Sequence, residues 1–413
     1  MKKLVLLLLA GASVLARGAE LHPKDFVAIC GDSITENKIY SVYLADYLLL
    51  CQPAAGLRAM QFGWSGEIAA GFRNRITHDV LPFHPTVATI CYGMNDGGYA
   101  ATSAERLSQY RTALVESIKE LKNGGVRFIV IASPGAVDID TYTRDVGAEV
   151  YNHTLGDFGE TAKQVAAENG VGFADIHNTL YDAMKRAKEK YGREYHVCGS
   201  DGVHPSENGN LVMAGVLLKA LGCTGDIGTF TLDLKSGQAQ ATEGHRIMKA
   251  ARGEATIEST RYPFCFYGDP AKPDSARGML AVYPFNDDLN RLQLVVKNVP
   301  PGRLRLTWGS VSKEFASADL AKGINLAAEF PDNPFSEPFA KAQAAIREQQ
   351  KMDTYLVKEF LHWTPGWSHL LPGNETNFAQ LETSVVKRAN EAANTVQQSL
   401  VPVEHTIRVE SVP

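Results

Sequence analysis

Three side chains of this sequence have the types and spacing that nucleophilic catalysis requires. Ser33 follows an apolar run, and Asp201 precedes His204 by three residues in the segment GSDGVHPSENG. A serine hydroxyl is a poor nucleophile at neutral pH and needs a base within hydrogen-bond reach, and that base needs a third group to fix its tautomer. One loop supplies both, with the Asp201 carboxylate turned onto the imidazole Nδ1 and Nε2 facing Ser33. We therefore interpret these residues as a catalytic triad.

Ser33 also has a structural interpretation. With Glu36 it matches the S-x-x-E capping box, in which the hydroxyl accepts a hydrogen bond from the helix backbone. Taken alone, this pattern favours a cap, because caps are far more common than nucleophiles. A lone loop histidine is likewise usually a surface or core residue. The combination of Ser33 with Asp201 and His204 favours chemistry instead.

Acyl transfer also needs donors for the negative charge that develops on the substrate oxygen. Asn95, in GMND, and Gly66, in GWSGE, offer a side-chain amide and an unobstructed N–H, and the Ser33 N–H heads a predicted helix. We predict an oxyanion hole from these three donors. Gly63 is a rival for the glycine, and we favour Gly66 because it is the second glycine of the G-x-x-G turn. An ordinary turn and loop are the structural alternatives for Gly66 and Asn95.

The pattern between residues 26 and 222 indicates which elements position these side chains. Five short apolar runs alternate with segments of helical period, which is typical of a doubly wound α/β domain with a parallel sheet. In such folds ligands bind outside the carboxyl ends of the strands, and Ser33, Gly66 and Asn95 each follow a run. The runs cover residues 27–30, 57–62, 87–92, 128–132 and 172–176.

Beyond Thr224 the pattern changes. The alternating stretches TFTLDL, EATIEST, RLQLVVKNV and RLRLTW predict antiparallel strands, and HTIRVESV predicts a closing strand. Two longer segments have apolar stripes of helical period. The stripes contain Phe339, Ala342, Ile346, Leu356 and Phe360 in the first, and Phe378, Leu381, Val385, Ala392 and Val396 in the second.

The N-terminus and the charge bear on location and partners. MKKLVLLLLAGASVLARGAE has two lysines, a short apolar run and small residues at a cleavage point, which is the pattern of a secretory signal peptide. A buried N-terminal strand or helix is the alternative. The net charge of the 413 residues is -5, without a block of like charges. We expect a soluble protein, secreted or periplasmic, with no nucleic-acid partner and no stable membrane insertion.

The six cysteines show no C-x-x-C spacing, so a metal cluster is not predicted. Cys30 and Cys91 lie within apolar runs and are expected to be small buried hydrophobes. Export permits disulfides among Cys198, Cys223 and Cys265, but their pairing stays open.

Four short motifs carry a resemblance to a known family. GDS after the first run, a glycine after the second, GxND after the third and DxxH near residue 204 resemble the four blocks of the SGNH/GDSL hydrolases, with Ser33, Gly66, Asn95 and His204 as their signature residues. The resemblance covers about residues 26–222. It implies a flavodoxin-like α/β/α sandwich with a five-stranded parallel sheet, no metal or cofactor, and ester hydrolysis through an acyl-serine intermediate, with His204 as base and then acid.

The resemblance also divides the chain. We expect a signal peptide over 1–19, an SGNH/GDSL hydrolase domain over 20–224, and an accessory region of β-strands and a helical hairpin over 225–413. The shape of FGWSGE followed by GMNDGGY further resembles exported, multi-domain esterases found beside carbohydrate-active enzymes.

Several residues are candidates for substrate binding. Asp32 and Asp96 are expected to shape the turns of the substrate site by accepting backbone hydrogen bonds. Trp64 is expected to line the mouth of the pocket, with simple packing as the alternative. The segment HWTPGWSHLLPGNE connects the two predicted helices and has the composition of a lid or glycan platform. For its tryptophans we favour a packing plug.

These observations together predict a secreted carbohydrate esterase, most specifically an O-acetylesterase acting on a small ester or an acetylated glycan. The sequence has no long aliphatic lid segment, which argues against long acyl chains. Two alternatives stay open. One is a broad hydrolase of the lysophospholipase or arylesterase type, and the other is a non-catalytic glycan-binding protein that kept the fold. The oligomeric state is not predicted.

Overall fold

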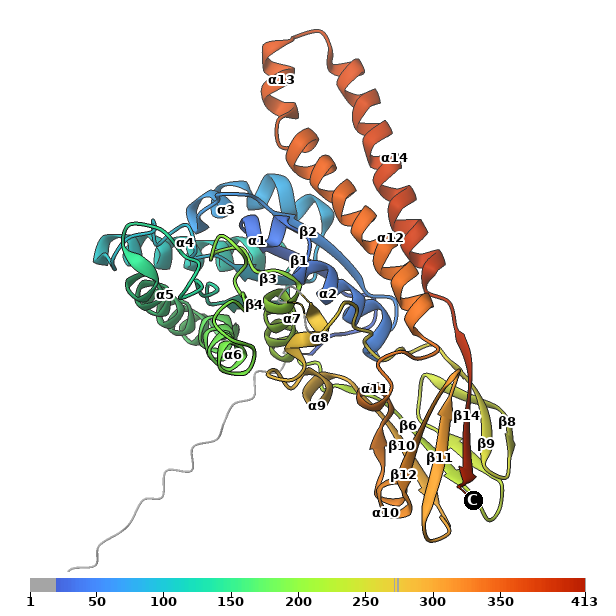
Figure 1. Ribbon diagram of the computed structural model, residues 1–413. Coiled ribbons are helices and arrows are strands. Elements are labelled where there is room, and N and C mark those ends of the chain that lie inside the picture. The colour runs from blue at the N-terminus through green and yellow to red at the C-terminus, as the bar shows by residue number, and fades with distance from the viewer. Residues whose placement is uncertain (1–19, 271, 273–274, 413) are drawn as a thin grey trace, which may run out of the picture.

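The structure, a computed structural model, describes residues 20–270, 272 and 275–412 (Figure 1). The signal peptide expected over residues 1–19 lies outside the described residues. The elements from Phe26 to Ala220 surround one parallel sheet, and those from Asp226 to Ser411 add two more sheets and a long helical hairpin.

The five predicted apolar runs form a wholly parallel sheet with the strand order β2-β1-β3-β4-β5. This is the flavodoxin-like order, so the predicted fold class is confirmed. The order reverses between β1 and β3, and ligands of open α/β sheets bind at such a point. The strands are β1 (Phe26–Gly31), β2 (Arg58–Gly63), β3 (Val87–Cys91), β4 (Phe128–Ala132) and β5 (Gly172–Ala174).

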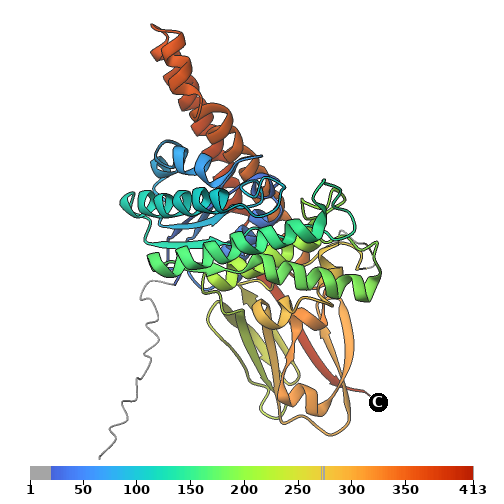
Figure 2. The ribbon, with the colours of Figure 1, turned by 90° about the vertical axis from the view of Figure 1, so that its left-hand side faces the viewer.

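Helices cover both faces of this sheet, which is why its strands are continuous apolar runs. On β1, Ala28 and Cys30 enter the core layer shared with α3, α4 and α5, whereas Val27 and Ile29 enter the layer shared with α2, α6 and α7. Figure 2 shows α4, α5 and α6, in teal and green, lying across the molecule. The helical elements are α1 (Ser33–Glu36), α2 (Tyr40–Asp46), η1 (Tyr47–Cys51), α3 (Ala69–Arg75), η2 (Ile76–Val80), η3 (Leu81–Phe83), α4 (Ala104–Asn123), α5 (Gly147–Asn169), α6 (Ile176–Tyr191) and α7 (Glu207–Ala220).

The β-rich part consists of two sheets whose inner faces share one core. The ring of Phe230 on one sheet packs against His245 and His405 on the other, at centroid distances of 5.0 and 5.6 Å. The first sheet contains β13 (Ile324–Asn325), β10 (Arg291–Lys297), β6 (Asp226–Asp233) and β7 (Ala239–Ala241). The second contains β12 (Val311–Ala316), β11 (Arg303–Trp308), β14 (Val403–Ser411), β9 (Glu254–Ser259) and β8 (His245–Ala251).

The predicted strands of this part are present and pair antiparallel as expected, except that β6 and β10 are parallel. β6 and β10 pair in parallel, because the chain leaves the first sheet after β7, passes through β8 and β9 of the second sheet, and returns at β10. The short helices of this part are α8 (Ala276–Met279), α9 (Phe285–Leu289), α10 (Ser317–Lys322) and α11 (Leu326–Glu329).

The two segments with predicted apolar stripes are helical and form a hairpin that projects past the parallel sheet in both views (Figures 1 and 2). Its elements are α12 (Ser336–Thr354), η4 (Tyr355–Leu361), α13 (Thr364–Leu370) and α14 (Glu375–Ser399). Polar contacts hold α12 against α2: Gln350 accepts a hydrogen bond from the Ser41 hydroxyl at 2.7 Å, and Gln343 donates to Asp46 at 2.6 Å.

Two further observations concern the described residues as a whole. Among them, no helix combines the length and the apolar character needed to cross a bilayer. All six cysteines fall within the described part of the chain and are free thiols in the structure, Cys30 and Cys91 being buried as expected.

Candidate active site

Ser33 lies at a tight turn from strand to helix. β1 ends at Gly31, where an added Cβ would lie 2.1 Å from Thr35 Oγ1, so the close approach of strand and helix requires glycine. Asp32 caps α1 by accepting a hydrogen bond from the Ile34 N–H at 3.0 Å. Ser33 is the first helical residue, and its hydroxyl lies 2.8 Å from His204 Nε2. The capping box considered for Ser33 and Glu36 is therefore not formed.

Asp201 orients His204. Asp201 Oδ2 lies 2.6 Å from His204 Nδ1, and Oδ1 accepts the N–H groups of Val203 and His204, both at 2.9 Å. Burial alone would raise the pKa of Asp201, but the hydrogen bonds from His204 and Val203 outweigh it and hold the pKa below its usual value. An ionised carboxylate only accepts, so Nδ1 carries the proton and Nε2 is left to accept the Ser33 hydroxyl proton.

The two candidate glycines differ in their surroundings. Gly63 donates its N–H to Gln61 Oε1 at 2.8 Å, and an added Cβ would lie 2.3 Å from the Glu36 nitrogen. Gly66 has a φ of +76° with nothing within 4 Å of an added Cβ, and it is the third residue of a turn closed by the Glu67 N–H and the Trp64 carbonyl at 3.1 Å. Its own N–H has no hydrogen-bond partner among the described residues. Gly63 is thus a packing glycine, and Gly66 is the one free to donate.

Asn95 is held beside this turn, which we call turn 64–67. Its Nδ2 donates to the Glu67 carbonyl at 3.0 Å, and its Oδ1 accepts from the Tyr99 hydroxyl at 3.1 Å. These contacts fix the plane of the amide and leave its second hydrogen available. The Ser33 N–H belongs to the first residue of α1 and therefore has no hydrogen-bond partner within the helix. Because β1 and β3 are neighbouring parallel strands, Ser33, which follows β1, and Asn95, which follows β3, lie at the same edge of the sheet.

A buried arginine anchors turn 64–67 through the carboxylate of Glu67. Arg75 lies 2.7 Å from Glu67 Oε1 through Nε and 2.8 Å from Oε2 through Nη2. The Tyr92 hydroxyl donates to the same Oε2 at 2.5 Å. These supporting residues, like Tyr99, were not predicted from the sequence. The acidic residue directly after Gly66 was the available signal.

Asp32 and Asp96 shape the backbone. Asp96 accepts hydrogen bonds from the Ala69 and Gly93 N–H groups at 2.9 and 3.0 Å, and Asp32 is only 4% exposed. Burial raises the pKa of Asp32 to about 7 and that of Asp96 to about 6. Their placement supports the expected turn-shaping role and gives no support to direct substrate contact.

Trp64 is half-buried, and two cationic side chains lie near its ring. Arg75 Cζ and Lys358 Nζ each lie 5.2 Å from its ring, and the His362 ring meets it edge-on at 4.6 Å. Lys358 and His362 belong to the C-terminal hairpin. The sequence alone did not indicate that this hairpin reaches the site.

One cluster near Trp64 has the residue types of a metal site. His78, Asp79 and His362 bring ligand atoms within 4.8 Å of one another. Asp79, however, already receives the two imidazole Nδ1 atoms at 2.7 and 2.8 Å, and Arg75 Nη1 lies 3.7 Å away. A cation would have to displace both contacts beside a guanidinium, so we interpret the cluster as a network that ties the hairpin to η2.

The expectation that the tryptophans of the hairpin connection form a plug is wrong. Trp363 and Trp367 are 49% and 39% exposed, because α13 extends beyond the body of the molecule (Figure 1). The His362 ring contacts Trp363 at 4.9 Å and Trp64 at 4.6 Å. An exposed aromatic surface therefore adjoins turn 64–67.

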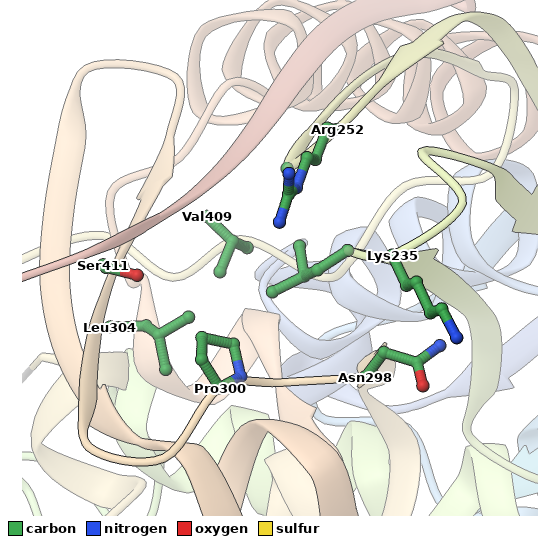
Figure 3. A pocket seen from close by; sticks show the side chains of 9 residues that line it. Lys235, Arg252, Asn298, Pro300, Leu304, Val409 and Ser411 are labelled. Atoms are coloured by element: carbon green, nitrogen blue, oxygen red, sulfur yellow. The ribbon is translucent and has the colours of Figure 1, made fainter.

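A separate hollow lies in the β-rich part. It has a volume of about 640 Å³ and shares no residue with the Ser33 site (Figure 3). Arg252 and Lys235 line it with the apolar side chains of Leu304 and Val409.

Comparisons with known proteins agree with this geometry. Residues 29–212 match the GDSL-like lipase/acylhydrolase family. An acetylxylan esterase of Geobacillus stearothermophilus is 23% identical over 189 residues, which make up 44% of this chain and 80% of that protein. The solved structure of a gut microbial diltiazem-metabolizing enzyme is 21% identical and has a TM-score of 0.73. The match covers 96% of this chain and 100% of that chain. The C-terminal region of this protein therefore has the same fold as the corresponding part of that enzyme. Residues 29–212 are therefore a hydrolase domain similar to the GDSL-like lipases/acylhydrolases, the SGNH/GDSL hydrolases, and the protein is an esterase.

Proposed function

We propose that this esterase removes O-acetyl groups from carbohydrates through an acyl-serine intermediate. The observation that carries the mechanism is the continuous chain of hydrogen bonds from the Ser33 hydroxyl to His204 and on to Asp201, with distances of 2.8 and 2.6 Å. This chain supplies a nucleophile, a base and a group that fixes the tautomer of the base.

In the proposed reaction, Ser33 Oγ attacks the acyl carbon while its proton passes to His204 Nε2. The negative charge on the former carbonyl oxygen is accepted by the N–H groups of Ser33 and Gly66 and by Asn95 Nδ2. The tetrahedral intermediate collapses, and the sugar hydroxyl leaves with the proton from His204. Water then attacks the acyl-serine by the same route, which releases acetate and restores Ser33.

Two observations support a carbohydrate substrate. The relative from Geobacillus stearothermophilus is an acetylxylan esterase. The exposed Trp363 adjoins turn 64–67 through His362, and aromatic faces of this kind stack on sugar rings. We further propose that the protein is exported, since its N-terminal segment has the pattern of a signal peptide.

A probe and a substrate series test this proposal. A fluorophosphonate probe is expected to label the protein at Ser33, and Ser33→Ala is expected to abolish both labelling and hydrolysis. Acetate released from acetylated xylan measures the carbohydrate activity, and p-nitrophenyl acetate is compared with a long-chain p-nitrophenyl ester. Faster hydrolysis of the long-chain ester would contradict the acetyl preference. Full activity of Ser33→Ala would contradict the mechanism.

A further inference from the structure

The C-terminal hairpin reaches the serine site through a shielded ion pair. Lys358 Nζ, from η4, lies 2.7 Å from Glu36 Oε1, and the two side chains are only 20% and 16% exposed. The other oxygen of Glu36 accepts a hydrogen bond from the Ser65 N–H at 2.5 Å. One carboxylate therefore joins three segments that are far apart in the sequence: helix α1, which begins with Ser33, turn 64–67, and the hairpin.

The same lysine contacts the turn a second time. Its Nζ lies 5.2 Å from the Trp64 ring, which His362 of the same hairpin meets edge-on. The hairpin thus touches the turn through the side chain of Trp64 and, by way of Glu36, through the backbone of Ser65. Neither contact involves a residue that we assign to proton transfer.

The charge of Glu36 makes this contact stronger than an ordinary surface pair. Burial by itself would raise its pKa, but the hydrogen bonds from Lys358 and Ser65 hold the pKa below the usual value. Glu36 is therefore ionised at neutral pH and receives two charge-assisted hydrogen bonds, which are shorter and stronger than neutral ones. Exposed ion pairs contribute little, whereas this one is largely shielded from water.

The geometry of the turn explains why this matters for catalysis. The Gly66 N–H belongs to the peptide plane that joins Ser65 to Gly66. Glu36 holds the Ser65 end of that segment, and the Glu67 end is held by Asn95, which binds the Glu67 carbonyl. With both ends held, the direction of the Gly66 N–H is fixed. Without the Glu36 contact, this end of the turn keeps, among the described residues, only the backbone bonds from the Trp64 N–H to the Gly31 carbonyl at 2.9 Å and from the Glu67 N–H to the Trp64 carbonyl at 3.1 Å, and the Ser65–Gly66 peptide plane gains freedom to rotate.

We propose that Lys358 is a positioning residue of the esterase: through Glu36 it fixes turn 64–67 so that the Gly66 N–H points at the oxyanion. The inference rests on the proposed function, because it assigns Gly66 to the oxyanion hole. It gives the C-terminal hairpin a role in the reaction that is separate from substrate binding.

The test uses the full chain and p-nitrophenyl acetate, a substrate too small to depend on the hairpin for binding. Lys358→Met keeps the length of the side chain and removes the charge. We expect its kcat to fall by about 10- to 100-fold, because small misplacements of catalytic groups have effects of this size. KM should stay within about threefold, since the contact acts on the transition state. Lys358→Arg should restore most of the kcat.

A matched control lies on the preceding helix. Lys351 on α12 pairs with Glu348 at 2.6 Å, and both side chains are more than half exposed. Lys351→Met should keep the kcat and KM of the unaltered protein. Circular dichroism and thermal unfolding establish that each variant is folded.

A double-mutant cycle tests the route through Glu36. If Lys358 acts through this carboxylate, the double variant Lys358→Met/Glu36→Gln should have a higher kcat than the product of the two single effects predicts. Independent, additive effects would contradict the route. A folded Lys358→Met with unaltered kcat, or with a change in KM alone, would overturn the inference.

Comparison with Ser33→Ala separates the two levels of failure. If Ser33→Ala is inactive while Lys358→Met is fully active, the positioning role is wrong and the proposed mechanism stands. If Ser33→Ala remains active, the proposed mechanism fails and the positioning role fails with it.

Discussion

At the scale of single residues, the site is a set of oriented hydrogen bonds in which each group is held by another. Asp201 holds the ring of His204, and Tyr99 and Glu67 hold the amide of Asn95. The groups assigned to chemistry could be predicted from the sequence because their types and order are characteristic. Their supports could not, because a tyrosine or glutamate has many possible partners and only the fold selects one.

Substitutions at His204 and Asp201 should differ in severity. Removing the base with His204→Ala is expected to lower kcat by about 10⁶-fold, and Asp201→Asn by about 10⁴-fold, because Asp201 orients the proton acceptor but does not transfer the proton. The measurement is kcat for p-nitrophenyl acetate, alongside the temperature of unfolding.

Neither substitution removes core packing, so both variants should unfold at nearly the temperature of the unaltered protein. A kcat for His204→Ala within about tenfold of the unaltered value would show that another group is the base. A larger loss for Asp201→Asn than for His204→Ala would contradict the assigned roles.

At the scale of elements, the predicted strands lie where the structure has them to within a few residues. The run at 128–132 coincides with β4, and the run at 27–30 lies within β1. Runs that are apolar on both faces permit only one interpretation in an α/β fold. The parallel pairing of β6 with β10 was not predictable in this way, because alternation defines a strand but not its partner.

Gly63, at the end of β2, and Gly66, in the turn that follows, have different expected roles: the first in packing and the second in the proposed oxyanion hole. Gly63→Ala would place a Cβ 2.3 Å from the Glu36 nitrogen, and we expect it to lower the free energy of unfolding by about 1–3 kcal/mol. Gly66→Ala meets no neighbour but keeps a positive φ, which costs about 1–2 kcal/mol or turns the peptide plane.

For this pair, kcat and chemical denaturation are measured together. Gly66→Ala should lose more kcat for a given loss of stability, since it alters the proposed donor itself. If Gly66→Ala had unaltered kcat while folded Gly63→Ala lost activity, the glycine of the oxyanion hole would be Gly63, the alternative weighed from the sequence.

At the scale of the whole molecule, the hairpin is docked by buried polar contacts that cross about 300 positions of the chain. Ser41 meets Gln350, and Asp46 meets Gln343. Undocking α12 would leave these groups without partners, which is costly for buried polar atoms. Periodicity predicted the two helices, but it does not encode which surface they cover. For this reason the sequence predicted a hairpin without predicting its place beside the serine site.

Asp46 makes this docking dependent on pH. Burial raises the pKa of Asp46 to about 7, although the hydrogen bond from Gln343 and the charge of Arg347 act in the opposite direction. The unfolded chain has the ordinary aspartate pKa of about 3.9. Between these values the folded protein binds a proton that the unfolded chain does not. The contribution of Asp46 to stability is therefore fully present below about pH 4 and is lost as the pH rises through about 7.

Asp46→Asn tests this, because the amide keeps an oxygen for Gln343 and cannot ionise. We expect the stability of the unaltered protein relative to Asp46→Asn to fall between pH 5 and pH 8, by at most about 1.4 kcal/mol per pH unit. Chemical denaturation at a series of pH values measures it, with a variant at the exposed Asp287 as control. Other buried groups contribute equally to both proteins and cancel in the difference. A difference that is constant with pH, or that grows in favour of the unaltered protein as the pH rises, would show that Asp46 is ionised in the folded state.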